Sequence, residues 1–133
     1  MHSRMTALVI VAGALALLSP HAQAQRISPM PAGNFLRFCN SPANGGQKIC
    51  DAYITGMADS FALVQKLSSE QGDGQSKSAQ SICVPTTATG ASMRGMVVSW
   101  LASHKDRLRN KVGEVVYTAL HDSYPCDATK SGG

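Results

Sequence analysis

Aromatic residues are scarce in this chain of 133 residues, which contains three Phe, three Tyr and one Trp. Its longest apolar run, residues 7–18, is shorter than the roughly 20 residues that a membrane-spanning helix needs. No segment alternates apolar and polar residues as a half-buried strand does. The composition also excludes collagen, a coiled coil and a disordered acidic tail. A domain of this size buries only about two thirds of its unfolded surface, so its core is modest and covalent cross-links matter.

Patterns typical of catalytic and metal sites are missing as well. The two histidines beyond the N-terminal segment, His104 and His121, have no Ser, Cys or carboxylate neighbour at a spacing typical of a triad. There is no H-E-x-x-H motif and no phosphate-binding glycine pattern, and the G-D-G of residues 72–74 is too short for a calcium loop. We therefore expect no catalytic residue, no cofactor and no metal, and a protein that is not an enzyme.

The first 24 residues have the layout of a secretory signal peptide. His2 and Arg4 precede the apolar run, and Ala22-Gln23-Ala24 forms a small-residue exit. This pattern predicts export to the periplasm, cleavage near Ala24 and no membrane insertion afterwards. The rest of the chain divides into an irregular lead-in (25–32), a helical domain (33–126) and a flexible tail (127–133).

All four cysteines, Cys39, Cys50, Cys83 and Cys126, lie beyond this segment. An exported protein meets an oxidising compartment, where an even number of cysteines indicates disulfides. A zinc site is the alternative, but structural zinc usually takes close C-x2-C pairs, which these spacings lack. A catalytic thiol is disfavoured because it needs a free sulfur and a paired base.

Apolar residues recur at steps of three and four along most of the domain, which predicts an all-α fold, a small bundle of about four helices stapled by two disulfides. The first helix covers residues 33–39, with Asn34 as N-cap, and ends at a turn cluster at 40–46. The second covers 47–67, where Gly56 indicates close approach of another helix, or else a surface position. The third begins near Thr86 or Thr87, and the last covers about Asp106 to Asp122. The second, third and last helices are predicted from their apolar positions, which are Ile49, Tyr53, Met57, Phe61 and Val64, then Met93, Met96, Val97, Trp100 and Leu101, then Leu108, Val112, Val115, Val116, Ala119 and Leu120.

This layout favours one of the three possible disulfide connectivities. A short turn joins the last two helices, so we expect them to lie antiparallel. Cys83 just precedes one and Cys126 just follows the other, so their Cα atoms should come within bonding range. The pairing is then Cys83 with Cys126 and Cys39 with Cys50.

Two polar segments stand out in the rest of the chain. Lys105, Arg107, Arg109 and Lys111, with Asp106 among them, have no interleaved aromatic residue, so we expect a solvated face and no nucleic-acid site. Residues 68–81 lack any large apolar residue and predict an exposed loop. A loop of this length is often either functional or merely disordered. If it is functional, we expect its apex to contact a partner. The residues concerned are Glu70, Asp73, Gln75 and Lys77.

Five blocks in order, with the four cysteines in register, give the chain its resemblance to a known family. They are G-N-F-L-R-F-C (33–39), C-D-A-Y-I-T-G-M-A-D (50–59), I-C-V-P (82–85), W-L-A-S-H (100–104) and V-V-Y-T-A-L-H-D-S-Y-P-C (115–126). In these blocks the chain resembles the Rap/Tai family, immunity proteins that neutralise peptidoglycan amidases delivered by bacterial type VI secretion.

The resemblance implies a small helical periplasmic protein, commonly a homodimer, that binds an amidase effector and occludes its active-site cleft. The polar loop is one candidate contact, and a helix face around Tyr53 and Phe61 is a candidate dimer surface, although both residues, like Trp100, also fit an ordinary core. A different class is the alternative: a periplasmic acid-stress chaperone, or a general envelope-stress helical protein, that exposes apolar surface at low pH.

Overall fold

Four α-helices and two short 3-10 helices make up the fold of the computed structural model, which describes residues 27–70 and 82–126. No strand occurs within these two stretches, so the prediction of an all-α fold with about four helices is confirmed. In chain order the elements are α1 (Ala32–Asn40), η1 (Ala43–Gly45), α2 (Gly46–Glu70), α3 (Gly90–Ser103), η2 (Lys105–Arg109) and α4 (Val112–Ser123). None of the helices described is both long and apolar enough to span a bilayer.

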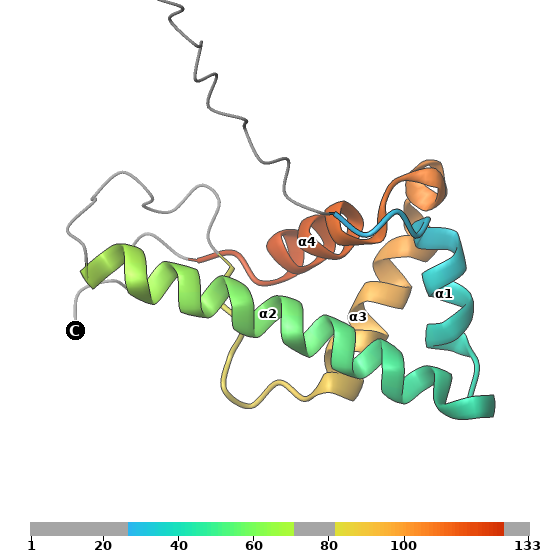
Figure 1. Cartoon of the computed structure of the whole chain (residues 1–133), viewed down its shortest axis with the longest axis horizontal. Helices are drawn as coiled ribbons and strands as arrows, with labels where there is room; N and C mark the ends of the chain where they lie inside the picture. Colours follow the sequence, from blue (N-terminus) through green and yellow to red (C-terminus); the bar gives the residue numbers. More distant parts are fainter. Residues whose placement is uncertain (1–26, 71–81, 127–133) are drawn as a thin grey trace, which may run out of the picture.

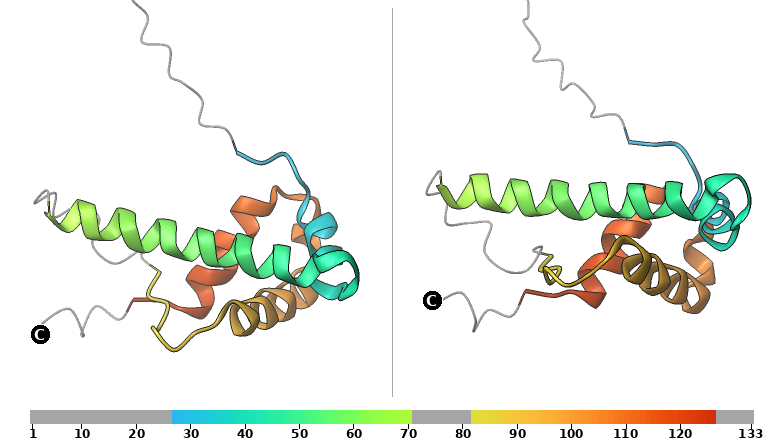
Figure 2. Two further views of the ribbon diagram at one scale, coloured as in Figure 1. Left: turned by 60° about the horizontal axis from the view of Figure 1, so that its bottom comes forward. Right: turned by 90° about the horizontal axis from the view of Figure 1, so that it is seen from below.

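The long helix α2 is the element around which the others assemble. Both α1 and α3 pack against it, and α4 packs against α3 and α2. In Figures 1 and 2 the end of α2 that carries Glu70 extends beyond α1, α3 and α4. One part of α2 is therefore covered on its inner side, whereas its last turns have few helical neighbours.

The core lies between α2 and the two later helices. On α2 the buried side chains Cys50, Ile54 and Ala58 follow one another at four-residue steps. Of the positions on which the sequence-based prediction rests, Tyr53, Met57 and Phe61 are partly buried against this core, whereas Ile49 and Val64 are exposed. The remaining core residues come from α1, α3, α4 and the segment before α3: Ala32, Phe35, Cys39, Ile82, Met93, Val97, Leu101, Val112, Val115, Val116, Ala119 and Leu120.

Two of the predicted N-caps are wrong. Helix α1 begins after Pro31, and Asn34 lies inside it, where its side-chain oxygen accepts a hydrogen bond from Arg37. Helix α3 begins after Thr89, because the Thr89 side chain caps the helix by bonding to Ser92, three residues later. Their side chains and backbone amides form a reciprocal capping box, with Thr89 Oγ1 accepting from the Ser92 amide at 3.1 Å.

The last helix begins at Val112 and not at Asp106. The intervening chain forms the 3-10 helix η2 and then pairs with the lead-in: Pro31 and Lys111 form an antiparallel β-bridge. The Val112 amide donates to the Met30 carbonyl at 2.8 Å, and the Ala32 amide donates to the Asn110 carbonyl at 2.9 Å. Because these bonds hold residues 110–111 extended, the helix cannot start before Val112.

The predicted disulfides are confirmed as Cys39–Cys50 and Cys83–Cys126. Backbone pairing outside the helices brings the second pair together: Ile82 bridges Pro125, and the Cys83 amide donates to the Tyr124 carbonyl at 2.8 Å. The first disulfide ties the end of α1 to the start of α2. All four cysteines are therefore cross-linked, and the chain holds no free thiol.

A candidate protein-binding face on helix α2

Large apolar side chains are exposed along α2. It carries Ile49 (57% exposed), Leu63 (57%), Val64 (59%) and Leu67 (46%), four of the seven exposed large apolar residues in the described chain. Single exposed apolar residues are normal on a protein surface, but a contiguous apolar patch indicates an interaction site.

Small residues separate these side chains on the same side of the helix. Ala52, Gly56 and Ser60 are exposed and lie four residues apart, so they follow one another along one side of α2. Ile49 precedes this row by three residues, and Leu63 and Leu67 continue it. We call this surface the outer face of α2, and it consists of Ile49, Ala52, Gly56, Ser60, Leu63 and Leu67.

In the part of the chain that the structure describes, no other helix meets Gly56. A Cβ atom built on Gly56 has no heavy atom within 4 Å, so the predicted close approach is wrong and Gly56 lies at the surface. The close approach occurs instead at Gly90, where a Cβ would lie 3.1 Å from both Asp51 Cβ and Thr55 Oγ1. The space above Gly56 is therefore available to a second molecule.

Contacts on the inner side hold α2 rigidly in place. Arg94 Nε of α3 lies 2.7 Å from Asp51 Oδ1 in a partly buried ion pair. The Phe35 and Tyr53 rings lie 5.0 Å apart, and the Phe61 and Tyr117 rings 4.9 Å apart. Tyr53 and Phe61 thus face α1 and α4, as ordinary core residues do, and burial raises the pKa of Tyr53 above 10.0.

The two histidines make structural contacts. His104 stacks on Trp100 at 3.8 Å between ring centroids, and its Nδ1 lies 2.8 Å from the Trp100 carbonyl. Trp100 Nε1 donates to Asp122 Oδ2 at 3.0 Å, and His121 Nδ1 lies 3.5 Å from Asp122 Oδ1. This cluster links α3 to α4, which gives both histidines a packing role. Among residues 27–70 and 82–126, no three His, Cys, Asp or Glu side chains come together as metal ligands would.

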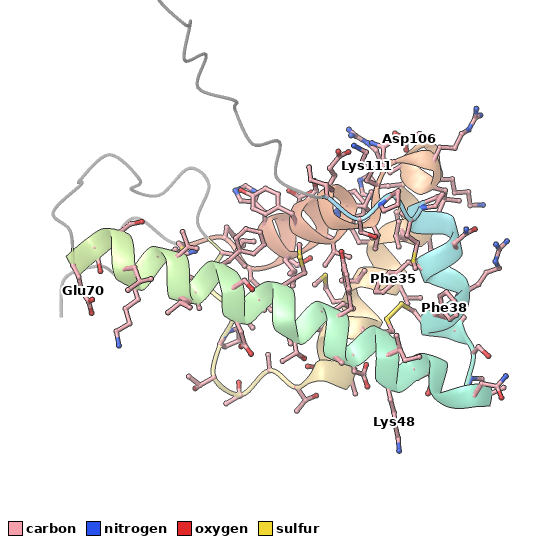
Figure 3. All side chains as sticks on the ribbon, in the orientation of Figure 1. Phe35, Phe38, Lys48, Glu70, Asp106 and Lys111 are labelled. Carbon is pink, nitrogen blue, oxygen red and sulfur yellow. A yellow bond between two sulfur atoms is a disulfide. The ribbon has the colours of Figure 1, made fainter. Side chains whose placement is uncertain are left out.

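Of the predicted contact residues, only Glu70 can be placed. It is exposed and ends α2, at the tip that extends beyond the other helices (Figure 3). Asp73, Gln75 and Lys77 lie outside the described residues. Close to this tip, Gln65 Nε2 donates to the Ile82 carbonyl at 3.2 Å and so ties α2 to the chain that enters α3.

Sequence reasoning did not identify the outer face of α2. The signal for it was present in the row Ala52, Gly56 and Ser60 with large apolar residues on either side. Periodicity alone indicates which residues share a side of a helix, but not which of two apolar sides faces the core.

Comparison with known proteins places these features in a family. A family model described as Rap1a immunity proteins matches residues 32–126, which is most of the chain and covers every helix of the structure. No curated protein and no solved structure matches the chain.

Proposed function

Because the chain belongs to the family of Rap1a immunity proteins, we propose that it binds and inhibits a peptidoglycan amidase that neighbouring bacteria deliver into the periplasm by type VI secretion. The family match over residues 32–126 carries this proposal. An amidase as target and the periplasm as the place of action are the finer parts of it. The two disulfides and the predicted signal peptide support an oxidising, exported setting.

Inhibition by this protein is a matter of binding and not of catalysis. A rigid surface that covers the effector's active-site cleft excludes the substrate without any chemical step. The helices are suited to this because two disulfides and the Asp51–Arg94 ion pair fix them relative to one another. A preorganised surface loses little conformational entropy on binding, which favours a tight complex.

The outer face of α2 supports a homodimer in this proposal. Apart from Leu67, its residues are symmetric about Gly56: Ile49 and Leu63 lie seven residues to either side, and Ala52 and Ser60 lie four. If two copies of α2 cross antiparallel at Gly56, each Ile49 meets the partner's Leu63 and each Ala52 meets the partner's Ser60. A two-fold dimer needs such a self-complementary surface, and glycine at the crossing point lets the two backbones approach closely.

The effector contact is then proposed at the tip of α2. Glu70 projects there, away from the crossing point at Gly56, and Asp73, Gln75 and Lys77 follow it in sequence. We propose that the effector and a second copy bind to these two parts of α2.

A pull-down followed by an activity titration tests the function. The oxidised protein serves as bait for secreted and periplasmic fractions of its source and of close neighbours, and captured material is assayed for peptidoglycan-amidase activity. We expect one captured amidase whose activity falls to zero at a stoichiometric ratio. Alanine at Glu70, Asp73, Gln75 and Lys77 should weaken inhibition, while alanine at four η2 positions, Lys105, Asp106, Arg107 and Arg109, serves as the matched control. If the protein captures many unrelated proteins, and more of them as the pH falls, the result would support the chaperone function instead. If it captures no protein, the immunity role is refuted.

Analytical ultracentrifugation tests the dimer separately. Gly56→Leu places a large side chain at the proposed crossing point but at an open position of the monomer, so we expect a folded protein that no longer dimerises. Gly95→Leu is the control, because a Cβ on Gly95 of α3 also meets nothing within 4 Å. A dimer that survives Gly56→Leu does not use this face.

A further inference from the structure

Positive charge is concentrated on one short segment of the chain. Eight Lys and Arg residues lie in the described stretches, and four of them are Lys105, Arg107, Arg109 and Lys111. All four side chains are exposed. Half of these cations therefore occur at alternate positions over seven residues.

The fold fixes this basic segment, residues 105–111, at one corner of the molecule. Leu108 is partly buried, and its carbonyl lies so close to α1 that a Cβ on Gly33 would approach it to 3.3 Å. Asn110 is held by the Ala32 amide, and Lys111 by its bridge with Pro31. In Figure 3, Asp106 and Lys111 lie together on the opposite side of the molecule from Lys48 and far from Glu70.

Carboxylates nearby neutralise only part of this charge. Asp106 Oδ2 lies 3.2 Å from Arg107 Nε, in an ion pair that is largely exposed to solvent. Glu114, in the first turn of α4, is the only other acidic residue between positions 105 and 114. In the described part of the chain, Lys105, Arg109 and Lys111 have no carboxylate within ion-pair distance. This corner therefore carries net positive charge on exposed side chains.

Two exposed apolar side chains accompany these cations. Ile27 is 50% exposed and Met30 36% exposed. The Met30 carbonyl binds the Val112 amide next to Lys111, and Ile27 Cγ2 lies close to Gly113, at 3.9 Å from a Cβ built there. The lead-in thus runs beside the end of the basic segment and carries these two exposed apolar side chains.

We propose that this corner binds peripherally to an anionic phospholipid surface. The cations would lie at the level of the phosphates, and Ile27 and Met30 would enter the boundary between headgroups and acyl chains, as the apolar side of an interfacial helix does. This is a binding activity separate from the inhibition of an effector. With η2 against a membrane, the Glu70 tip of α2 remains remote from the contact and accessible to a protein.

The side-chain chemistry favours a lipid surface over an acidic protein. The centres of protein interfaces are rich in aromatic residues and Arg and poor in Lys. Two of the four cations are Arg, but the other two are Lys and the segment contains no aromatic residue. Three of them, Lys105, Arg109 and Lys111, have no ion-pair partner in the described part of the chain, and such exposed side chains fit a fluid layer of phosphates better than they fit a rigid acidic surface.

Vesicle binding tests the proposal directly. The oxidised protein is purified in the form that remains after processing in the cell. It is sedimented with vesicles of phosphatidylglycerol and phosphatidylethanolamine, and with vesicles of phosphatidylcholine alone. We expect binding to the anionic vesicles only, and its loss in salt of about 0.5 M, where the screening length is only a few ångström. No binding to anionic vesicles at low salt, or equal binding to both kinds, would overturn the proposal.

Matched variants identify the surface that binds. Lys105→Gln, Arg109→Gln and Lys111→Gln together remove three charges, and each cation near an anionic surface accounts for about fivefold in affinity, so binding should fall roughly 100-fold. The control, Arg37→Gln, Lys48→Gln and Lys66→Gln, removes the same charge elsewhere and should retain most of the binding. Circular dichroism and thermal unfolding verify that both variants are folded. Equal losses in the two variants would mean that the basic segment is not the contact, and capture by a polyglutamate resin in place of vesicles would indicate an acidic protein partner.

Discussion

Replacing Gly56 with alanine should stabilise the monomer. Gly56 lies in the middle of α2, is exposed, and has open space where a Cβ would stand. Alanine at an exposed helix interior is favoured over glycine by about 1 kcal/mol, because glycine loses more backbone entropy when the helix forms. No contact among residues 27–70 and 82–126 opposes this gain, so Gly56→Ala should raise the free energy of unfolding by about 1 kcal/mol.

Chemical and thermal unfolding of the oxidised protein measure this change. The experiment is carried out at a concentration at which sedimentation shows only monomer, so that self-association does not contribute. For a domain of about 100 residues, 1 kcal/mol corresponds to a rise in Tm of roughly 4–8 °C. The denaturant m-value should stay constant, because the surface exposed on unfolding hardly changes.

Two other glycines make the test decisive. Gly95 of α3 is also open, so Gly95→Ala should give a similar gain. Gly90→Ala should give a smaller gain than the other two or a loss, because its Cβ would lie 3.1 Å from Asp51 Cβ and Thr55 Oγ1 at the contact of α3 with α2, and these atoms would have to shift. A loss of stability in monomeric Gly56→Ala would refute the reasoning, since it would mean that another part of the same chain covers the outer face of α2.

Three further changes have predictable results. Serine in place of both cysteines of the Cys83–Cys126 disulfide should cost about 4 kcal/mol, and the same change at Cys39–Cys50 about 3 kcal/mol, because the longer loop loses more entropy on closure; equal losses in urea unfolding would contradict this account. Burial raises the pKa of the Tyr53 phenol in the folded protein above its value in the unfolded chain. The stability that the neutral phenol contributes is therefore fully present below pH 10 and is lost as the pH rises further. Tyr53→Phe should therefore remove part of the alkaline decrease in stability, and an unchanged pH profile would count against it. Thr89→Ala breaks the capping box of α3 and should cost about 1 kcal/mol, whereas Thr87→Ala, two residues earlier in a turn, should have little effect in the same assay.

Local sequence patterns predicted the parts of the fold that depend on local forces. The three-and-four spacing of apolar residues identified α2, α3 and α4, and the positions of Cys83 and Cys126 identified their pairing. The start of α4 was mispredicted because its determinant is distant in sequence: Pro31 and its neighbours hold Lys111 extended from about 80 residues away. No pattern within residues 105–112 contains that information.

The candidate binding face was harder to predict, because α2 carries apolar residues on two sides. Ile49 continues the same periodic row as Tyr53, yet Tyr53 packs against Phe35 while Ile49 is exposed. The structure resolves this by placing α1 and α3 against the side that contains Cys50 and Ile54. Sequence periodicity specifies a helix and its faces, but the neighbouring helices determine which face remains at the surface.

The connectivity of the disulfides has a consequence for how the protein matures. Each cysteine is joined to the next one along the chain, the first to the second and the third to the fourth. If the chain crosses a membrane N-terminus first, as its predicted signal peptide requires, Cys39 and Cys50 emerge and can be oxidised before Cys83 appears, and Cys83 then has only Cys126 to join. An oxidase that links cysteines in their order of arrival thus produces the native pairs directly, and the protein should mature normally in cells that lack a disulfide isomerase.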